Sequence, residues 1–303
     1  MSQSSASRVM LADNSAVSTN PLYISVRECS LVGNRTFVRE DGHRGSRQRR
    51  SCRARISSDV SAGAIGGYFG PTEIDWLLGR VVGSIGGSTG TGTAADPWLP
   101  AEALTKFYAL VDKVQSKFLY EVWPSSLEIS GSEQQYVNWT MNLMGRAEST
   151  FASSWPATAP TCETAFLFSD ATFTYNSTTY KIKSFRLTID NVLDDQNYQN
   201  AITPADFEAQ DLDVRLELEC VYNSDNAALY RAALAGAAAK LALSDGTTTY
   251  NFQFGNAKLP ANSGPTIPAT GRITFPVTIE AYRSATISSP TAADAQLQMW
   301  KVT

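Results

Sequence analysis

Histidine is scarce in this sequence, and this scarcity limits the catalytic and metal-binding sites that the chain can form. His43 is the only histidine among 303 residues. This count excludes a metal site built from several histidines and makes any catalytic triad depend on one residue. His43 lies among arginines and glycines, without the rigid frame and carboxylate partner that a catalytic histidine needs. We therefore expect no enzyme of this kind and no cofactor.

Cysteine pairs, a signal peptide and a membrane anchor are also missing. The longest apolar run, residues 227–243, is interrupted by Arg231 and Lys240, and residues 1–20 have no apolar core of signal-peptide length. The cysteines form no CxxC pair and no zinc-binding spacing, so we expect reduced, buried thiols in a chain made inside a cell. These cysteines are Cys29, Cys52, Cys162 and Cys220.

Alternation of apolar and charged residues dominates the pattern that is present. From Leu212 to Cys220 every even residue is apolar and the odd ones are charged, which predicts a strand with one buried face in an antiparallel sheet. Residues 165–175, 180–189 and 273–282 alternate in the same way. With 43% hydrophobic residues and a net charge of −4, the chain is predicted to be folded, mainly β and not a basic nucleic-acid binder.

Two short helices reveal an internal repeat. One is expected after Pro71 and the other after Ser224, and each ends near a glycine, Gly83 or Gly236. Each follows a predicted strand and precedes a hairpin. We therefore predict two tandem copies of a β-sandwich or barrel unit, each with one short helix. The expected boundaries are an N-terminal arm at 1–20, a first unit at 21–147, a linker at 148–160, a second unit at 161–287 and a C-terminal arm at 288–303.

Opposite charges fall on matching segments of the two copies. Nine arginines make residues 23–55 strongly basic, whereas residues 190–213 contain seven acidic residues and no basic one. Matched segments of opposite sign favour contacts between copies of the chain. The residues predicted at such contacts are Arg35, Arg39, Arg44, Arg47, Arg49, Arg50, Arg53, Asp194, Asp195, Asp206, Glu208 and Asp211.

The charged segments also allow two other functions. The pairs Asp194–Asp195 and Asp211–Asp213 are compatible with a carbohydrate-active enzyme or adhesin, since glycosidases use two carboxylates across a cleft. The basic segment alone is compatible with a protein that binds nucleic acid or anionic lipid.

Several segments together resemble the major tail tube proteins of long-tailed, non-contractile bacteriophages. The residues that carry this resemblance are 39–45 (REDGHRG), 61–63 (SAG), 71–78 (PTEIDWLL), 139–145 (WTMNLMG) and 185–191 (FRLTIDN). The order of these segments extends over roughly residues 20 to 285.

This resemblance implies a structural virion protein with no catalytic residues, made in the host bacterial cytoplasm. With this resemblance, the nucleic-acid-binding alternative is a virion or capsid-decoration protein. Such proteins assemble into rings whose sheets join edge to edge around a channel for DNA, and the rings stack into a tube. A chain with two units would complete a pseudo-six-fold ring with three copies; six copies are the alternative. The implied partners are other copies of the chain, the tape measure protein in the lumen, tail terminator and tail-tip proteins, and DNA in transit.

Overall fold

The computed structural model describes most of the chain, and the described part consists mainly of β-strands. It comprises residues 8–17, 21–39, 54–83, 91–151, 163–224, 226, 227, 229, 237–259, 265, 267, 272–283 and 295–303. Its strands join into one antiparallel sheet of seventeen strands. The prediction of a mainly β fold is therefore confirmed.

The elements of the first half of the chain include the α-helix α1. They are β1 (Arg8–Ala12), β2 (Leu22–Ile24), β3 (Val26–Cys29), β4 (Val32–Val38), β5 (Arg55–Tyr68), α1 (Pro71–Val81), β6 (Phe107–Asp112), β7 (Lys117–Ser132), β8 (Asn138–Arg146) and β9 (Ser149–Thr150).

The second half continues with eight strands after a short 3-10 turn at Phe168–Asp170. They are β10 (Ala171–Tyr175), β11 (Thr178–Tyr180), β12 (Ile182–Asp194), β13 (Glu208–Val221), β14 (Ala237–Ser244), β15 (Thr249–Lys258), β16 (Thr274–Tyr282) and β17 (Leu297–Val302). The second predicted helix falls largely outside the described residues.

Local sequence explains α1. Pro71 opens the helix, where its missing N–H costs nothing, and Glu73 places a negative charge in the first turn. Ile74, Leu77 and Val81 follow the helical spacing, and all three are buried against the sheet. The helix predicted after Pro71 is thus confirmed.

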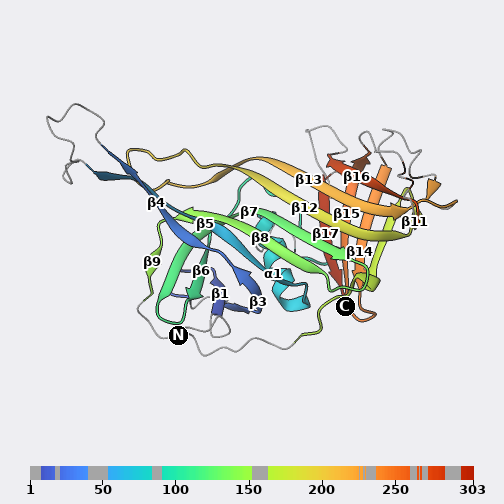
Figure 1. Ribbon diagram of the computed structural model, residues 1–303, viewed down its shortest axis with the longest axis horizontal. Helices are drawn as coiled ribbons and strands as arrows, with labels where there is room; N and C mark the ends of the chain where they lie inside the picture. Colours follow the sequence, from blue (N-terminus) through green and yellow to red (C-terminus); the bar gives the residue numbers. More distant parts are fainter. Residues whose placement is uncertain are drawn as a thin grey trace.

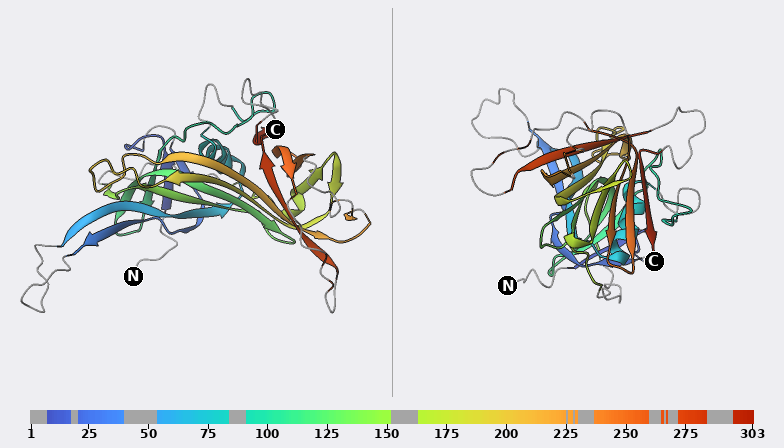
Figure 2. Two further views of the ribbon diagram at one scale, coloured as in Figure 1. Left: turned by 90° about the horizontal axis from the view of Figure 1, so that it is seen from above. Right: turned by 90° about the vertical axis from the view of Figure 1, so that its right-hand side faces the viewer.

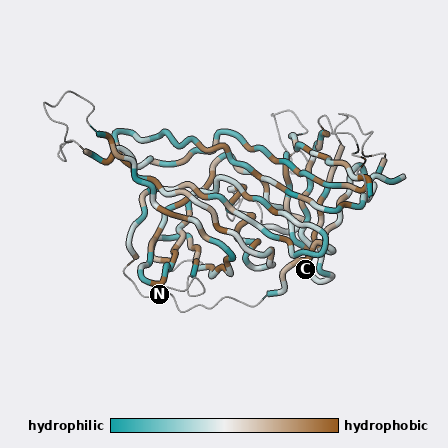
Figure 3. Tube along the Cα trace, in the orientation of Figure 1, coloured by the Kyte–Doolittle hydropathy of each residue, from teal (hydrophilic) through white to brown (hydrophobic). Residues whose placement is uncertain are grey.

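The long strands form a bowed sheet, with α1 on its convex side (Figures 1 and 2). Apolar and polar residues alternate along them (Figure 3). In β13, Val214, Leu216 and Leu218 face the core, while Arg215 and Glu217 between them face outward. The alternation at 212–220 therefore predicted the buried face correctly.

Strand pairing in the second half follows that in the first. β5 pairs with β3, β4 and β8, as β13 pairs with β12 and β16. β6 lies between β1 and β7, as β14 lies between β10 and β15. β7 also pairs with β8 and β9, as β15 pairs with β16 and β17.

Irregularities in the two ladders make the correspondence residue-specific. The ladder of β3 and β4 with β5 slips at residues 26–28 and again at 36–37. The ladder of β12 with β13 slips at 182–184 and at 192–193. Since bulges are specific features rather than noise, matching slips align β3–β4 with β12, β5 with β13 and β8 with β16, residue for residue.

One ladder joins the two halves. β7 and β12 pair antiparallel over seven positions, from Ser126 opposite Asp190 to Ser132 opposite Ser184. Inward residues of both strands, such as Leu127 and Ile189, are fully buried, and one hydrophobic cluster extends through both halves.

Both ends of the chain differ from the expected arms. Residues 8–12 form β1 between β2 and β6, and Val9, Met10 and Leu11 are buried. Residues 297–302 form β17 along β15, with Leu297 and Met299 buried. Each segment is short, but its apolar residues complete a core that the rest of the sheet provides. The unit boundaries and the 148–160 linker remain a prediction, and residues 152–160 lie outside the described part.

Candidate functional site

The outward face of the joined sheet is polar. The strand register places Glu128 of β7, Thr188 of β12, Arg215 of β13 and Glu280 of β16 on this face, in successive strands. On each strand, the residues immediately before and after the named one point into the core. Because α1 covers the other side, this polar surface lies on the concave side of the bowed sheet (Figure 2).

Carboxylates outnumber basic groups on this face, as counted in the described residues. Arg186 forms an ion pair with Glu128 at 2.6 Å, and Arg215 contacts Asp213 at 3.0 Å. The acidic members include Glu28, Glu128, Asp190, Asp213, Glu217, Glu219 and Glu280, and the basic members include Arg27, Arg146, Lys183, Arg186, Arg215 and Lys258.

Two carboxylates oppose each other directly on this face. Asp190 of β12 pairs in register with Asp213 of β13. Partial burial raises the pKa of Asp190 above its ordinary value, and Asp213 raises it further, whereas Arg215 lowers it. Like charges at opposed positions destabilise a sheet, so the polar face carries negative charge at a cost in stability.

Aromatic and polar contacts hold α1 against strands of the second half. Phe69, which precedes α1, packs edge-to-face on Tyr250 of β15, with ring centroids 5.3 Å apart. The Tyr250 hydroxyl lies 2.7 Å from the Pro71 carbonyl, and Lys301 of β17 forms an ion pair of 2.8 Å with Asp75 of α1. Burial and Asp75 both raise the pKa of Tyr250, which keeps the hydroxyl protonated.

The loop between β12 and β13 docks on the first half of the chain. The backbone N–H of Asp59 donates to the Ile202 carbonyl at 2.7 Å, and Arg146 donates to the Pro204 carbonyl at 3.1 Å. Phe207 packs on Trp123, with ring centroids 5.1 Å apart. Arg146 also lies over the Trp123 ring, so one arginine and one tryptophan anchor this loop.

The predicted arginines are only partly described. Arg35 forms an ion pair with Asp59 at 2.9 Å within its own half. Arg39 follows β4 directly. The other predicted arginines, together with His43, lie outside the described residues: Arg44, Arg47, Arg49, Arg50 and Arg53.

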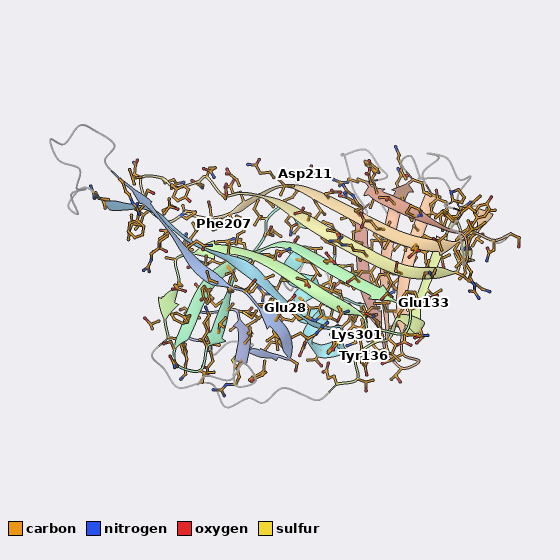
Figure 4. All side chains as sticks on the ribbon, viewed as in Figure 1. Glu28, Glu133, Tyr136, Phe207, Asp211 and Lys301 are labelled. Atoms are coloured by element: carbon orange, nitrogen blue, oxygen red, sulfur yellow. The ribbon has the colours of Figure 1, made fainter. Side chains whose placement is uncertain are left out.

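The predicted acidic residues share one hairpin. Asp194 accepts a hydrogen bond from the Gln196 backbone, and Asp206 accepts one from Asn197. Asp195 also contacts Gln196, while Glu208 and Asp211 begin β13 (Figure 4). Within the described residues, no ion pair joins this hairpin to a predicted arginine.

Sequence reasoning missed the polar face as a functional surface. Its signal was present in the charged odd-numbered residues of 212–220, but which strands share a face depends on register. Cys220 is buried, which raises the pKa of its thiol to about 12, and Cys29 is partly buried. In the part of the chain that the structure covers, no three metal-binding side chains cluster, and no helix is long and apolar enough to cross a membrane.

An extended sheet with one polar concave face and, among the described residues, an unpaired strand edge at β3–β4 is typical of a structural subunit for assembly. Comparison with known families specifies the class: the family model of the phage tail tube protein matches residues 4–295. The match covers nearly the whole chain, so the chain belongs to this family and is a structural component of the virion tail. A search of curated proteins found no match.

Proposed function

We propose that three copies of the chain close a ring, that rings stack into the tube of a non-contractile tail, and that the polar face lines the channel. The matching ladders of the two halves carry the proposal. Each half contributes the same strands, and the β7–β12 ladder joins the halves within one chain. Repeating that junction between chains gives a closed, pseudo-six-fold ring.

The strand edges support this arrangement. In the described residues β12 is paired on both sides, by β13 and β7, whereas β3 and β4 are paired only with β5. An unpaired edge is a template for another strand. The second half of another copy can pair with this edge in the same way as β12 pairs with β7 within one chain, so no new type of contact is needed.

The polar face suits a channel for DNA. A surface with excess carboxylates repels phosphates, so DNA passes without binding to the wall. In this role the protein acts mechanically, without catalysis. The tape measure protein is the expected occupant of the lumen during assembly, and terminator and tip proteins are the expected partners at the tube ends.

The charged segments provide contacts between copies. The basic hairpin loop between β4 and β5 corresponds to the acidic loop between β12 and β13, which already docks on the first half of its own chain. In the ring, the basic loop meets acidic residues of the next copy. A single exposed pair contributes only about 0–1 kcal/mol, but a repeated set fixes register.

Ring stoichiometry tests the proposal. Native mass spectrometry of purified rings, with averaged electron micrographs, is expected to show three chains and six similar lobes around a channel. Rings of six chains would contradict the three-copy arrangement. A protein that stays monomeric at high concentration, without rings or tubes, would contradict self-assembly itself.

A further inference from the structure

A cavity lies between the start of β13 in the second half and the segment after α1 in the first half, beside the residues of β12 and β13 that correspond to the site where the first half receives a loop. Its volume is about 480 Å³, and it is lined by Val82, Asn191, Asp211, Leu212, Arg283 and Gln296, among others. Figure 4 labels Asp211 beside it, near the start of β13. The alignment of the two strand ladders identifies the residues of the first half that correspond to those lining the cavity.

Two residues of the first half's docking site have counterparts in this cavity. The aligned bulges place Asp59 on Leu212 and Arg35 on Asn191. Asp59 donates its N–H to the acidic loop at Ile202 and pairs with Arg35. The cavity thus occupies the position that the β12–β13 loop fills in the first half.

The anchoring pair also has a counterpart. In the first half Arg146, the last residue of β8, lies over the Trp123 ring, at 5.8 Å from the centroid. In the second half Tyr282, the last residue of β16, lies under Lys258, at 5.2 Å. The cation and the ring have exchanged strands, and Arg283, the residue after Tyr282, lines the cavity.

We propose that this cavity receives the β4–β5 hairpin loop of a second copy of the chain. The inference rests on the proposed function, since it requires a neighbouring copy. β4 and β5 extend to one end of the molecule, away from Asp211 of the cavity (Figures 1 and 4). The loop between them corresponds to the docked acidic loop, and the cavity of its own chain lies away from the ends of β4 and β5, so the counterpart site that it fills belongs to a second copy.

Charge supports this occupant. Asp211 and Glu102 line the cavity and are exposed, and Arg283 is the basic group among the lining residues. The β4–β5 loop sequence, residues 39–54, is rich in arginine. The acidic loop, in contrast, accepts a hydrogen bond from Arg146 of the first half. Each loop therefore faces groups of opposite charge.

A charge swap tests the assignment. The variant Arg47→Glu with Arg49→Glu and Arg50→Glu is expected to reduce tube yield about tenfold or more at low salt while leaving the monomer's melting temperature unchanged. Adding Asp211→Arg and Glu102→Arg is expected to restore tubes. The matched control adds Asp194→Lys and Asp195→Lys instead, and is expected to restore none, because that hairpin docks within its own chain.

Cross-linking tests proximity independently of charge. With Ala209→Cys at the cavity and the natural Cys52 in the loop, a short bis-maleimide is expected to link neighbouring chains in assembled tubes. Cys52→Ser is expected to abolish the link. Tubes that form normally but show no Cys52-dependent link, or rescue by the Asp194 and Asp195 changes, would overturn the docking assignment. Absence of tubes from the unmodified chain would instead overturn the proposed function.

Discussion

The two halves of the chain share one pattern of pairing but fill their cores differently. Trp139 of β8 lies opposite Gly67 of β5, and the corresponding pair in the second half is Phe275 opposite Cys220. A Cβ on Gly67 would lie 3.2 Å from the Trp139 ring. The larger aromatic residue, Trp139, thus lies opposite a glycine, and the smaller Phe275 lies opposite a cysteine. The strand register is the same in both halves, and a larger side chain on one strand is offset by a smaller one on its partner.

The halves also differ in what covers them. β12 is paired on both sides within the chain, whereas its counterpart β3–β4 has a partner on one side in the described residues. The β12–β13 loop is docked on the first half, whereas a cavity lies beside the corresponding residues of β12 and β13. In each case, one half makes the contact within the chain, and the corresponding surface of the other half is left for a neighbouring copy.

The largest effect is expected from removing the tryptophan that distinguishes the first core. Trp139→Ala should lower the free energy of unfolding by about 4 kcal/mol, because it leaves a cavity and removes the hydrogen bond from the indole N–H to the Tyr68 carbonyl. Urea unfolding followed by circular dichroism measures it. Tyr68→Ala, at an exposed ring on the outer face, is the control and should cost far less. Equal losses would contradict the packing argument.

A smaller loss is expected at the docked loop. Arg146→Ala removes the donor to the Pro204 carbonyl and the cation over Trp123, and should cost about 2 kcal/mol. Limited proteolysis should then cut residues 195–207 faster. Arg283→Ala, at an exposed arginine just after β16, should change monomer stability by less than about 0.5 kcal/mol. An unchanged cleavage rate in the Arg146 variant would show that the loop is held by other contacts.

The contact between α1 and the second half should contribute less to stability than the docked loop does. Tyr250→Phe removes the hydroxyl that bonds to the Pro71 carbonyl and Asp75, and should cost about 1 kcal/mol. Thermal unfolding provides the measurement. In the control, Tyr282→Phe, the hydroxyl contacts Glu280 at the surface, so stability should hardly change. If both variants melt alike, the buried hydroxyl contributes nothing specific.

The smallest effect is expected on the polar face, with the opposite sign. Asp190→Asn removes one of two opposed carboxylates and should raise the free energy of unfolding by about 0.5 kcal/mol at neutral pH. Because the pKa of Asp190 is raised in the folded state, its ionised form opposes folding. The gain should therefore disappear as pH falls below about 4, where Asp190 is protonated in both states.

A carboxylate with the opposite pKa shift provides the control for that measurement. Asp245 accepts hydrogen bonds from the Thr247 and Thr248 amides, which lower its pKa. Asp245→Ala should reduce stability at neutral pH, and the loss should shrink as pH falls through the carboxyl range. Parallel pH profiles for the two variants would contradict the assigned signs.

Local sequence accounts for the elements whose pattern is regular. The alternation at 212–220 predicted β13 and its buried face, and Pro71 with the following apolar spacing predicted α1. The predicted strand at 165–175 begins only at Ala171, after the 3-10 turn at Phe168–Asp170. Terminal strands were missed because β1 and β17 are too short to show a period by themselves.

The sequence by itself determined which residues of β12, β13 and α1 can face a core, through the alternation of the two strands and the apolar stripe of the helix. It also determined that the two hairpins carry opposite charges. These follow from neighbours a few residues apart. Only the tertiary structure decided that β12 pairs with β7, that the acidic loop docks on Arg146, and that polar residues of separate strands form one concave face. Such contacts join residues far apart in the chain, and their register depends on bulges and side-chain volumes that no local pattern contains.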